Sequence, residues 1–388
     1  MKSKKISRLF SLLLVLALLF TFGISAMATA PVSENITKSL SDSIISIETS
    51  IPKDIFGGIY LNNNGTIVLN VTDITRINTD TIRRYAGANK IIVNEVEYSL
   101  SFLESAHKSL VPYMQEYGIM SLDANEVTNT LDIVLIDQST KLQVEELINK
   151  SYDSKYVNIT ISSNDFSLEF SHGNINDDCP PEGNYMHEYA SQTRSAGIIY
   201  PGKRIIKGTY SYTAGPKYSS NKFLTAGHAA YDVFDPKFYA PGAQPWDTNI
   251  EIGTQGSIVF GLSGDRLTVT LRSGYNSFEL PSTNSFIIGT GTYSYTNSIV
   301  VGTNIEMHGA YSGVSSGRVL ATNQTVLIDN TTVGNLARAD YTCQRGDSGA
   351  GIFSYNAFNV TGYCYGTQSI GAFTENSDIS LFSYFSQN

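Results

Sequence analysis

From Ala196 to the C-terminus, the sequence consists of short apolar runs separated by Gly, Ser, Thr and Tyr, and helical periodicity is almost absent. Many short strands at such spacing are typical of an all-β barrel or sandwich. The last part of the chain is therefore predicted to be all-β. The candidate strands are 198–200, 204–206, 222–225, 257–260, 267–271, 298–301, 318–320, 351–353 and 360–363.

Within this all-β part, Gly346-Asp347-Ser348-Gly349 predicts a tight turn that exposes a serine. Gly346 has no Cβ, so its backbone can adopt conformations that other residues avoid. The N–H groups of Gly346 and Ser348 can then converge beside the Ser348 hydroxyl, as in an oxyanion hole next to a nucleophile. We expect Asp347 to brace the turn. By itself, such a string also occurs in ordinary turns of β-rich proteins.

A histidine lies 120 residues upstream, where the apolar segment Phe223–Thr225 leads into Ala226-Gly227-His228. A serine–histidine pair needs a carboxylate that orients the imidazole and stabilises its positive charge. Asp265 is the preferred candidate because it follows a glycine turn and precedes an apolar strand, and Asp247 is the second choice.

These segments resemble the chymotrypsin-like (S1 family) serine proteases, in the secreted bacterial branch of α-lytic protease and the streptogrisins. The resemblance implies a double six-stranded β-barrel over 196–388 and a serine endopeptidase that acts through an acyl-enzyme. It implies a catalytic triad of His228, Asp265 and Ser348 and an oxyanion hole formed by the N–H groups of Gly346 and Ser348. No metal or organic cofactor is implied.

The resemblance also implies which strand contacts the substrate backbone and walls the specificity pocket. The segment that matches this strand is Tyr363, Cys364, Tyr365 and Gly366. The residue at the base of the pocket is Tyr341 or Thr342, which argues against a preference for Arg or Lys.

Cysteine positions differ from the family pattern. Ala229 stands where the family has a cysteine after the histidine, and Cys343 keeps the family's position before the nucleophile turn. A Cys343–Cys364 disulfide is one expectation, and two unpaired thiols are the alternative. In this branch an arginine contacts the carboxylate that precedes the catalytic serine, which is Asp347 here. His308 is expected to take the place of that arginine, and the alternative is that His308 is an ordinary surface histidine.

The first 28 residues have the pattern of a secretory signal peptide. A basic start is followed by the apolar run Leu9–Ile24 and by the small-residue pattern Ala26-Met27-Ala28. We therefore expect a secreted, extracellular protein with no membrane span after cleavage; an uncleaved anchor is the alternative.

Residues 29–170 are predicted to form a small α+β domain behind a loose leader at 31–57. Asn62–Gly65 indicates a hairpin, Ser101–Glu104 a helix capping box, and 140–150 a second helix. The domain resembles the pro-region of α-lytic-type proteases, which assists folding and inhibits the enzyme; an unrelated secreted domain is the alternative. Residues 171–195, which include Cys179, are expected to be a linker that is cut on maturation.

Charge separates the two parts of the chain. Residues 31–195 contain 11 basic and 23 acidic residues, whereas residues 196–388 contain 11 and 12. Such asymmetry suggests two units with different roles. The net charge of −9 and the absence of basic runs argue against nucleic-acid binding.

We expect a monomer whose partners are a peptide substrate and its own pro-region. The rival hypotheses are a catalytically silent binding or adhesion module and an ester hydrolase.

Overall fold

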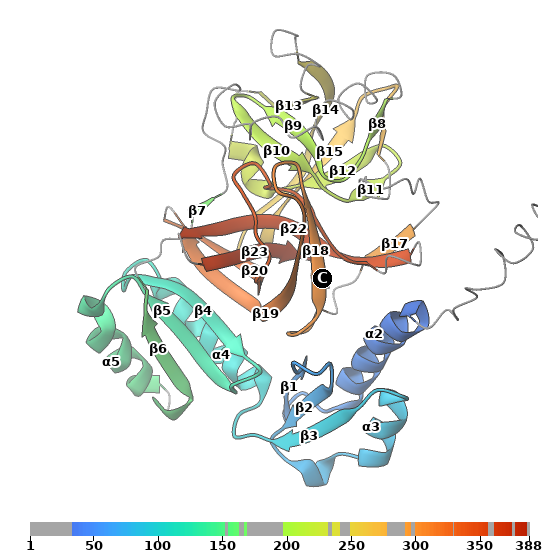
Figure 1. The fold of residues 1–388 in the computed structure, drawn as a ribbon. Coiled ribbons are helices and arrows are strands. Elements are labelled where there is room, and N and C mark those ends of the chain that lie inside the picture. Colours follow the sequence, from blue (N-terminus) through green and yellow to red (C-terminus); the bar gives the residue numbers. More distant parts are fainter. Residues whose placement is uncertain are drawn as a thin grey trace, which may run out of the picture.

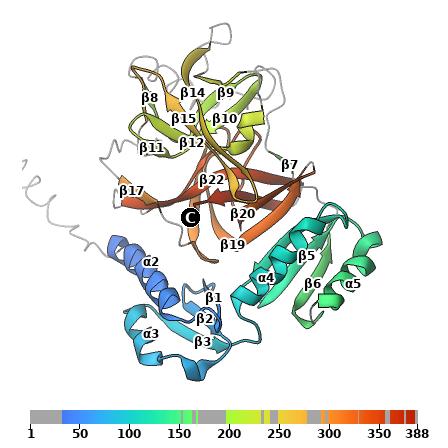
Figure 2. The same cartoon turned by 180° about the vertical axis from the view of Figure 1, so that it is seen from behind.

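The computed structural model describes residues 33–151, 154–162, 167–168, 197–231, 235–240, 249–277, 292–295, 299–328, 330–355, 361–374 and 377–385. The signal-peptide and linker predictions for 1–28 and 171–195 lie outside the described residues. The described chain forms two β-barrels and an α+β region. The α+β region lies against the second barrel, on the side away from the first barrel (Figures 1 and 2).

The first barrel is an antiparallel sheet whose strand order is β10-β9-β13-β14-β15-β12-β11. The N–H of Gly215 donates to the carbonyl of Leu224 (2.7 Å), which joins the end of β10 to β12 and so brings the two sides of the sheet together. Phe223, Phe238 and Leu267 fill its interior. The strands are β9 (Lys203–Lys207), β10 (Tyr210–Ala214), β11 (Lys217–Ser219), β12 (Lys222–Thr225), β13 (Lys237–Ala240), β14 (Ile250–Gly261) and β15 (Gly264–Leu271).

The second barrel has the strand order β18-β21-β22-β23-β20-β19, and β18 also pairs with β19, so the strands form a closed ring. Met307, Ile352 and Phe382 are among its buried core residues. Its strands are β18 (Asn304–Gly309), β19 (Gly313–Ile328), β20 (Thr331–Ala339), β21 (Gly351–Tyr355), β22 (Thr361–Thr374) and β23 (Ser377–Tyr384). The short strands β8 (Ile198–Ile199), β16 (Asn276–Ser277) and β17 (Thr292–Tyr295) lie outside this ring. The predicted double barrel preceded by α+β structure is thus confirmed.

The α+β region contains the same element order twice, which the sequence interpretation missed. In each copy the first two strands pair antiparallel and the last two pair parallel. Each copy also has its own hydrophobic core. Copy 1 comprises α2 (Ser33–Ser50), β1 (Phe56–Leu61), β2 (Ile67–Val71), α3 (Thr79–Ala86) and β3 (Ile91–Glu95); copy 2 comprises α4 (Leu100–Leu110), β4 (Ile119–Asn125), β5 (Thr130–Leu135), α5 (Lys141–Ser151) and β6 (Val157–Ile161). Short 3-10 helices at Ile74–Arg76, Val111–Tyr113, Gln138–Thr140 and Ser154–Tyr156 connect these elements.

The prediction of a loose leader at 31–57 is wrong, because α2 occupies most of it. Leu40, Ile44, Ile47 and Ile51 recur at helical spacing and pack in the core of copy 1. The N-cap of the helix α4 lies two residues before the predicted capping box at Ser101. Ser99 is this N-cap, and the hydroxyl of Ser99 accepts the N–H of Phe102.

The α+β region contacts the second barrel through one edge of each copy. β4 pairs antiparallel with β19, so the sheet of copy 2 continues the barrel sheet. In copy 1, the N–H of Leu61 donates to the carbonyl of Val301 (2.8 Å), and the guanidinium of Arg318 donates to the carbonyls of Leu61 and Asn62 (3.0 and 2.6 Å). In the described part of the chain, no helix is both long and apolar enough to cross a membrane.

Candidate active site

His228 lies on the 3-10 helix η5 (Gly227–Tyr231), directly after β12. Its backbone N–H donates to Oδ1 of Asp265 (2.7 Å), and its ring Nδ1 lies 2.7 Å from Oδ2 of the same carboxylate. A Cβ on Gly227 would lie 2.2 Å from the carbonyl oxygen of Val259 and 2.9 Å from Oδ1 of Asp265, so only glycine allows this approach. The imidazole is therefore held in one orientation from two sides.

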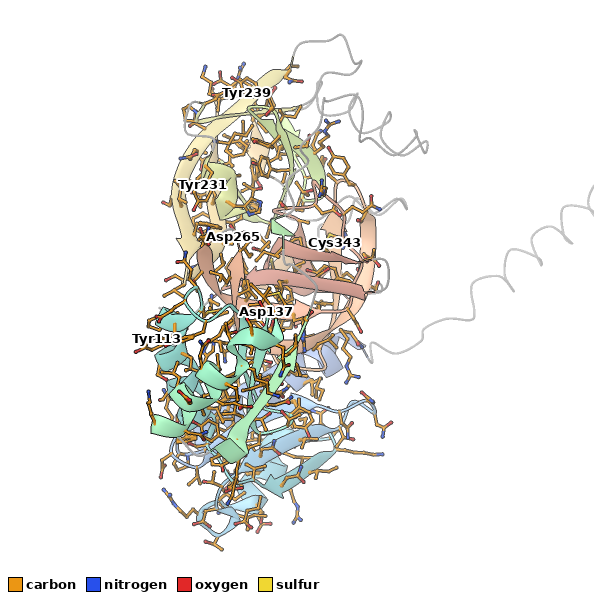
Figure 3. The ribbon with its side chains drawn as sticks, turned by 90° about the vertical axis from the view of Figure 1, so that its left-hand side faces the viewer. Tyr113, Asp137, Tyr231, Tyr239, Asp265 and Cys343 are labelled. Carbon is orange, nitrogen blue, oxygen red and sulfur yellow. The ribbon has the colours of Figure 1, made fainter. Side chains whose placement is uncertain are left out.

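Asp265 is the second residue of β15 and is fully buried, and Figure 3 places it where the two barrels meet. Three hydroxyl side chains of the second barrel contact it, and one of them, that of Thr367 on β22, donates to the backbone carbonyl of Asp265 (3.5 Å). Ser369 on β22 donates its hydroxyl to Oδ2 (2.5 Å), and Ser383 on β23 accepts the N–H of Asp265 (3.0 Å). The sequence analysis missed Ser369, because nothing in its local sequence distinguishes it from other buried strand serines.

Ser348 comes from the second barrel, and its Oγ lies 3.1 Å from Nε2 of His228. The turn that carries it has positive φ angles at Gly346 (96°) and Gly349 (90°), a conformation that favours glycine. Thr213 on β10 holds this turn from the first barrel: its N–H donates to the carbonyl of Ser348 (2.8 Å), and its hydroxyl donates to that of Gly346 (2.9 Å). The relative position of nucleophile and base is thus fixed across the barrel interface.

Asp347 is fully buried beneath this turn. Its carboxylate accepts the N–H groups of Tyr311 (2.9 Å), Ser312 (3.2 Å) and Gln344 (2.8 Å) and the hydroxyl of Ser312 (2.5 Å). Burial raises the pKa of Asp347, and these hydrogen bonds oppose the rise.

The expectation that His308 meets Asp347 is wrong. The Nε2 of His308 lies 3.5 Å from a carboxylate oxygen of Glu306, and its ring packs edge-on against Phe353. The hydroxyl of Ser312 and the backbone amides of its loop occupy the place that a cation was expected to fill.

The predicted substrate segment at 363–366 ends one residue before Thr367, which makes the first contact of β22 with Asp265. Cys364 and Tyr365 are buried, Tyr365 packs in the core of the second barrel, and the hydroxyl of Tyr365 donates to that of Ser354 (3.2 Å). Tyr363 and Gly366 flank them on β22. Farther along the strand, the carbonyl of Gln368 accepts the N–H of Gly349 (2.8 Å) and Ser369 contacts the carboxylate of Asp265. The predicted pocket-base residue Tyr341 is also buried, and it donates its hydroxyl to the side-chain oxygen of Gln368.

The Cys343–Cys364 disulfide is absent, and both thiols are buried. The Sγ of Cys343 lies 3.5 Å from the side-chain nitrogen of Gln368 and 2.9 Å from the hydroxyl of Ser380. Cys364 stands four residues before Gln368 on β22, which corresponds to roughly 13 Å along a strand. The Sγ of Cys364 lies 4.0 Å from the carbonyl oxygen of Gly366, so the two thiols have different surroundings. Cys179 and Asp247 lie outside the described residues.

A short segment from the end of the α+β region lies against the same part of β22. Ser167–Leu168 (β7) pairs antiparallel with β22, with Leu168 opposite Ile370 and Ser167 opposite Gly371. These partners directly follow Ser369, which contacts Asp265. The intact chain thus places its own backbone along the strand beside the triad (Figure 1).

The arrangement has the parts needed for nucleophilic catalysis: a hydroxyl, an imidazole in contact with it, and a carboxylate on the far ring nitrogen. His228, Asp265 and Ser348 are each 0% exposed. Among the described residues, no cluster of His, Cys, Asp and Glu could hold a metal ion.

No protein-family model and no curated protein matches the sequence. Solved structures that are similar include protease A of Thermobifida fusca (22% identity, TM-score 0.36, 48% of this chain and 91% of that chain). They also include a glutamic-acid-specific serine protease (23%, TM-score 0.39, 48% and 93%) and an α-lytic protease homologue, N4 (16%, TM-score 0.36, 48% and 93%). The similarity covers about half of this chain and nearly all of each matched protein, and it is one of fold.

Proposed function

We propose that this protein is a secreted serine endopeptidase that cleaves peptide bonds with a His228–Asp265–Ser348 triad and is made as an inactive precursor. One observation carries the proposal: a continuous, buried hydrogen-bond chain runs from Ser369 through Asp265 and His228 to Ser348. Its members come from both barrels, so the chain exists only when the two barrels are docked.

In the first step, Nε2 of His228 takes the proton of the Ser348 hydroxyl while Oγ attacks the substrate carbonyl carbon. The developing oxyanion is stabilised by the N–H groups of Gly346 and Ser348. His228 then gives its proton to the leaving amine as the C–N bond breaks, which leaves an acyl-enzyme. A water molecule, deprotonated by His228, attacks the ester, and Ser348 regains its proton when the acid product leaves.

Through these steps the carboxylate of Asp265 stabilises the imidazolium of His228. Ser369 and the N–H of His228 keep its two oxygens in place. Asp347 supports the turn and takes no proton from the substrate.

Precursor inactivity is supported by two features of the intact chain. Ser348 exposes none of its surface, and β7 pairs with β22 beside the triad. A substrate strand needs free backbone groups on its docking strand. We therefore propose that cleavage between the α+β region and the barrels frees this strand, and that the signal-peptide pattern at 1–28 directs export.

The test is hydrolysis of an unstructured protein such as casein by the exported, processed protein. Wild type is expected to cleave it, and His228→Ala and Ser348→Ala are expected to lose at least a thousandfold in kcat/KM. A Ser354→Ala variant, which changes a buried barrel serine away from the triad, is expected to remain active. Equal activity in wild type and Ser348→Ala would reject the triad, and a folded, processed wild type without activity would favour the binding-module hypothesis.

A further inference from the structure

Two buried carboxyl groups lie where the α+β region meets the second barrel. Asp123 on β4 is 2% exposed, and Glu126 in the turn after β4 is 4% exposed. The same strand β4 pairs with β19 of the barrel, with Ser121 opposite Val326 and Leu122 opposite Thr325. Both carboxyl groups are therefore at the junction itself.

Their surroundings provide few donors. The hydroxyl of Thr322 on β19 donates to Oε1 of Glu126 (3.0 Å). The amide of Asn70 on β2 donates to the backbone carbonyl of Glu126 (2.7 Å), which joins copy 1 to this point. Oδ1 of Asp123 has no hydrogen-bond partner among the described residues. An ionised carboxylate in such a site is poorly solvated.

Charged groups of both signs lie near the two carboxyl groups. Glu104 on α4 and Asp132 on β5 disfavour ionisation of Glu126 and Asp123, respectively, and Glu48 at the end of α2 adds negative charge next to Glu104. In the opposite direction, Arg338 on β20 and a side-chain hydrogen bond with Gln324 on β19 favour ionisation of Asp123, and the exposed Lys53 and Lys108 lie near Glu104. The other titratable groups are Tyr384 on β23, whose hydroxyl donates to Asn323 (2.5 Å), and His107 on α4.

Burial therefore raises the pKa of Asp123 well above its usual range and raises that of Glu126 to about 7. His107 has its pKa lowered to about 4 by burial, so it stays neutral above that pH. Tyr384 has its pKa raised by burial and stays protonated.

We propose that Asp123 and Glu126 form a protonation-controlled lock between the α+β region and the second barrel, which is closed when both carboxyl groups are neutral and weakened when they ionise. In the docked chain, Thr322 and its neighbours on β19 cover these groups. When β4 separates from β19, water reaches the carboxylates and they ionise without penalty. Docking is thus linked to proton uptake, independently of whether the barrels catalyse any reaction.

The sign and range of the effect follow from this linkage. For Glu126 the docked pKa of about 7 exceeds the ordinary value of 4.5. Docking is therefore strongest below pH 4.5, weakens by up to tenfold per pH unit as the pH rises toward 7, and changes little above that. Glu126 alone shifts the docking equilibrium by about two orders of magnitude, and Asp123 acts in the same direction.

The test is hydrogen–deuterium exchange of the full chain, carrying Ser348→Ala to prevent self-cleavage, at pH 5, 6, 7 and 8. After correction for intrinsic rates, protection of peptides from β4 (Ile119–Asn125) and β19 (Gly313–Ile328) is expected to fall about a hundredfold from pH 5 to 8. Protection of β14–β15 in the first barrel is expected to stay constant. A parallel loss there would mean general unfolding and would overturn the proposal.

The matched variants are Asp123→Asn with Glu126→Gln, whose amides mimic the neutral carboxyl groups, and Glu146→Gln, an exposed position on α5 of the same copy. The double variant is expected to keep its protection at pH 8, and Glu146→Gln is expected to behave as wild type. A double variant that keeps the wild-type pH profile would refute the assignment. If the double variant does not fold, a wild-type profile without pH dependence at β4 and β19 still refutes the lock.

Discussion

At the scale of single residues, Ser369 has the most direct link to the proposed chemistry. It donates to the same carboxylate oxygen of Asp265 that faces Nδ1 of His228. In Ser369→Ala, that oxygen loses one donor, and we expect kcat to fall about tenfold with little change in KM. Steady-state kinetics on a peptide substrate measures this. Ser354→Ala serves as the control, and a Ser369→Ala variant with wild-type kcat would remove Ser369 from the mechanism.

Ser312 gives a second prediction through the buried carboxylate of Asp347. The turn needs an ionised Asp347, so activity is expected to fall as the pH drops through its raised pKa. Without the Ser312 hydroxyl, which lowers that pKa, Ser312→Ala is expected to lose activity at a higher pH than wild type. The pH profile of kcat/KM measures the shift. Ser312→Thr should restore the profile and His308→Ala should leave it unchanged; a shift in His308→Ala alone would contradict the observed contacts.

The residues found from sequence are those whose local context is distinctive. His228 follows a strand and a glycine turn, Asp265 follows a glycine hairpin, and Ser348 stands between glycines. Ser369 and Thr213 act through strand register across the barrel interface, which a single sequence does not specify. For the same reason, the predicted substrate segment at 363–366 lies a few residues before Ser369, the residue of β22 that contacts the carboxylate of Asp265.

At the scale of elements, Arg318 on β19 connects the second barrel to copy 1 by hydrogen bonds. Its side chain donates to the carbonyls of Leu61 and Asn62, to that of Gly302 and to the side chain of Asn63. Arg318→Ala is expected to lower amide protection in β1 and its hairpin by roughly tenfold to a hundredfold. Hydrogen exchange of the Ser348→Ala chain measures this. Arg272→Ala, which removes a contact with Tyr275 in the first barrel, is the control, and unchanged protection in Arg318→Ala would contradict the role of this contact.

The elements show where pattern recognition worked. The hairpin at Asn62–Gly65 joins β1 and β2, and the apolar face with Leu103, Ala106 and Leu110 became the buried face of α4. The duplication was missed because the two copies have the same order of elements and the same strand pairings, and these are not evident as a repeat in the sequence. α2 was missed although Ile44, Ile47 and Ile51 carried the helical period.

At the scale of the whole molecule, the β4–β19 pairing suggests a folding role for the α+β region, as the family resemblance implied. Barrels depend on strand pairings that are distant in sequence and therefore form slowly. Residues 196–388 expressed alone are expected to refold with much lower yield of active protein than when 29–170 is added in trans. Recovered activity after refolding measures this. The control is a 29–170 segment that carries Leu122→Pro and therefore cannot form β4. Equal yields with and without the segment would contradict a folding role.

The central claim is that His228 activates Ser348, and covalent labelling with a fluorophosphonate followed by peptide mapping tests it most directly. We expect a label on Ser348 in the exported, processed protein, slower labelling of the intact chain, and no label on Ser348 in His228→Ala. A folded and processed 196–388 product that takes no label on Ser348, or a His228→Ala variant that labels like wild type, would contradict it.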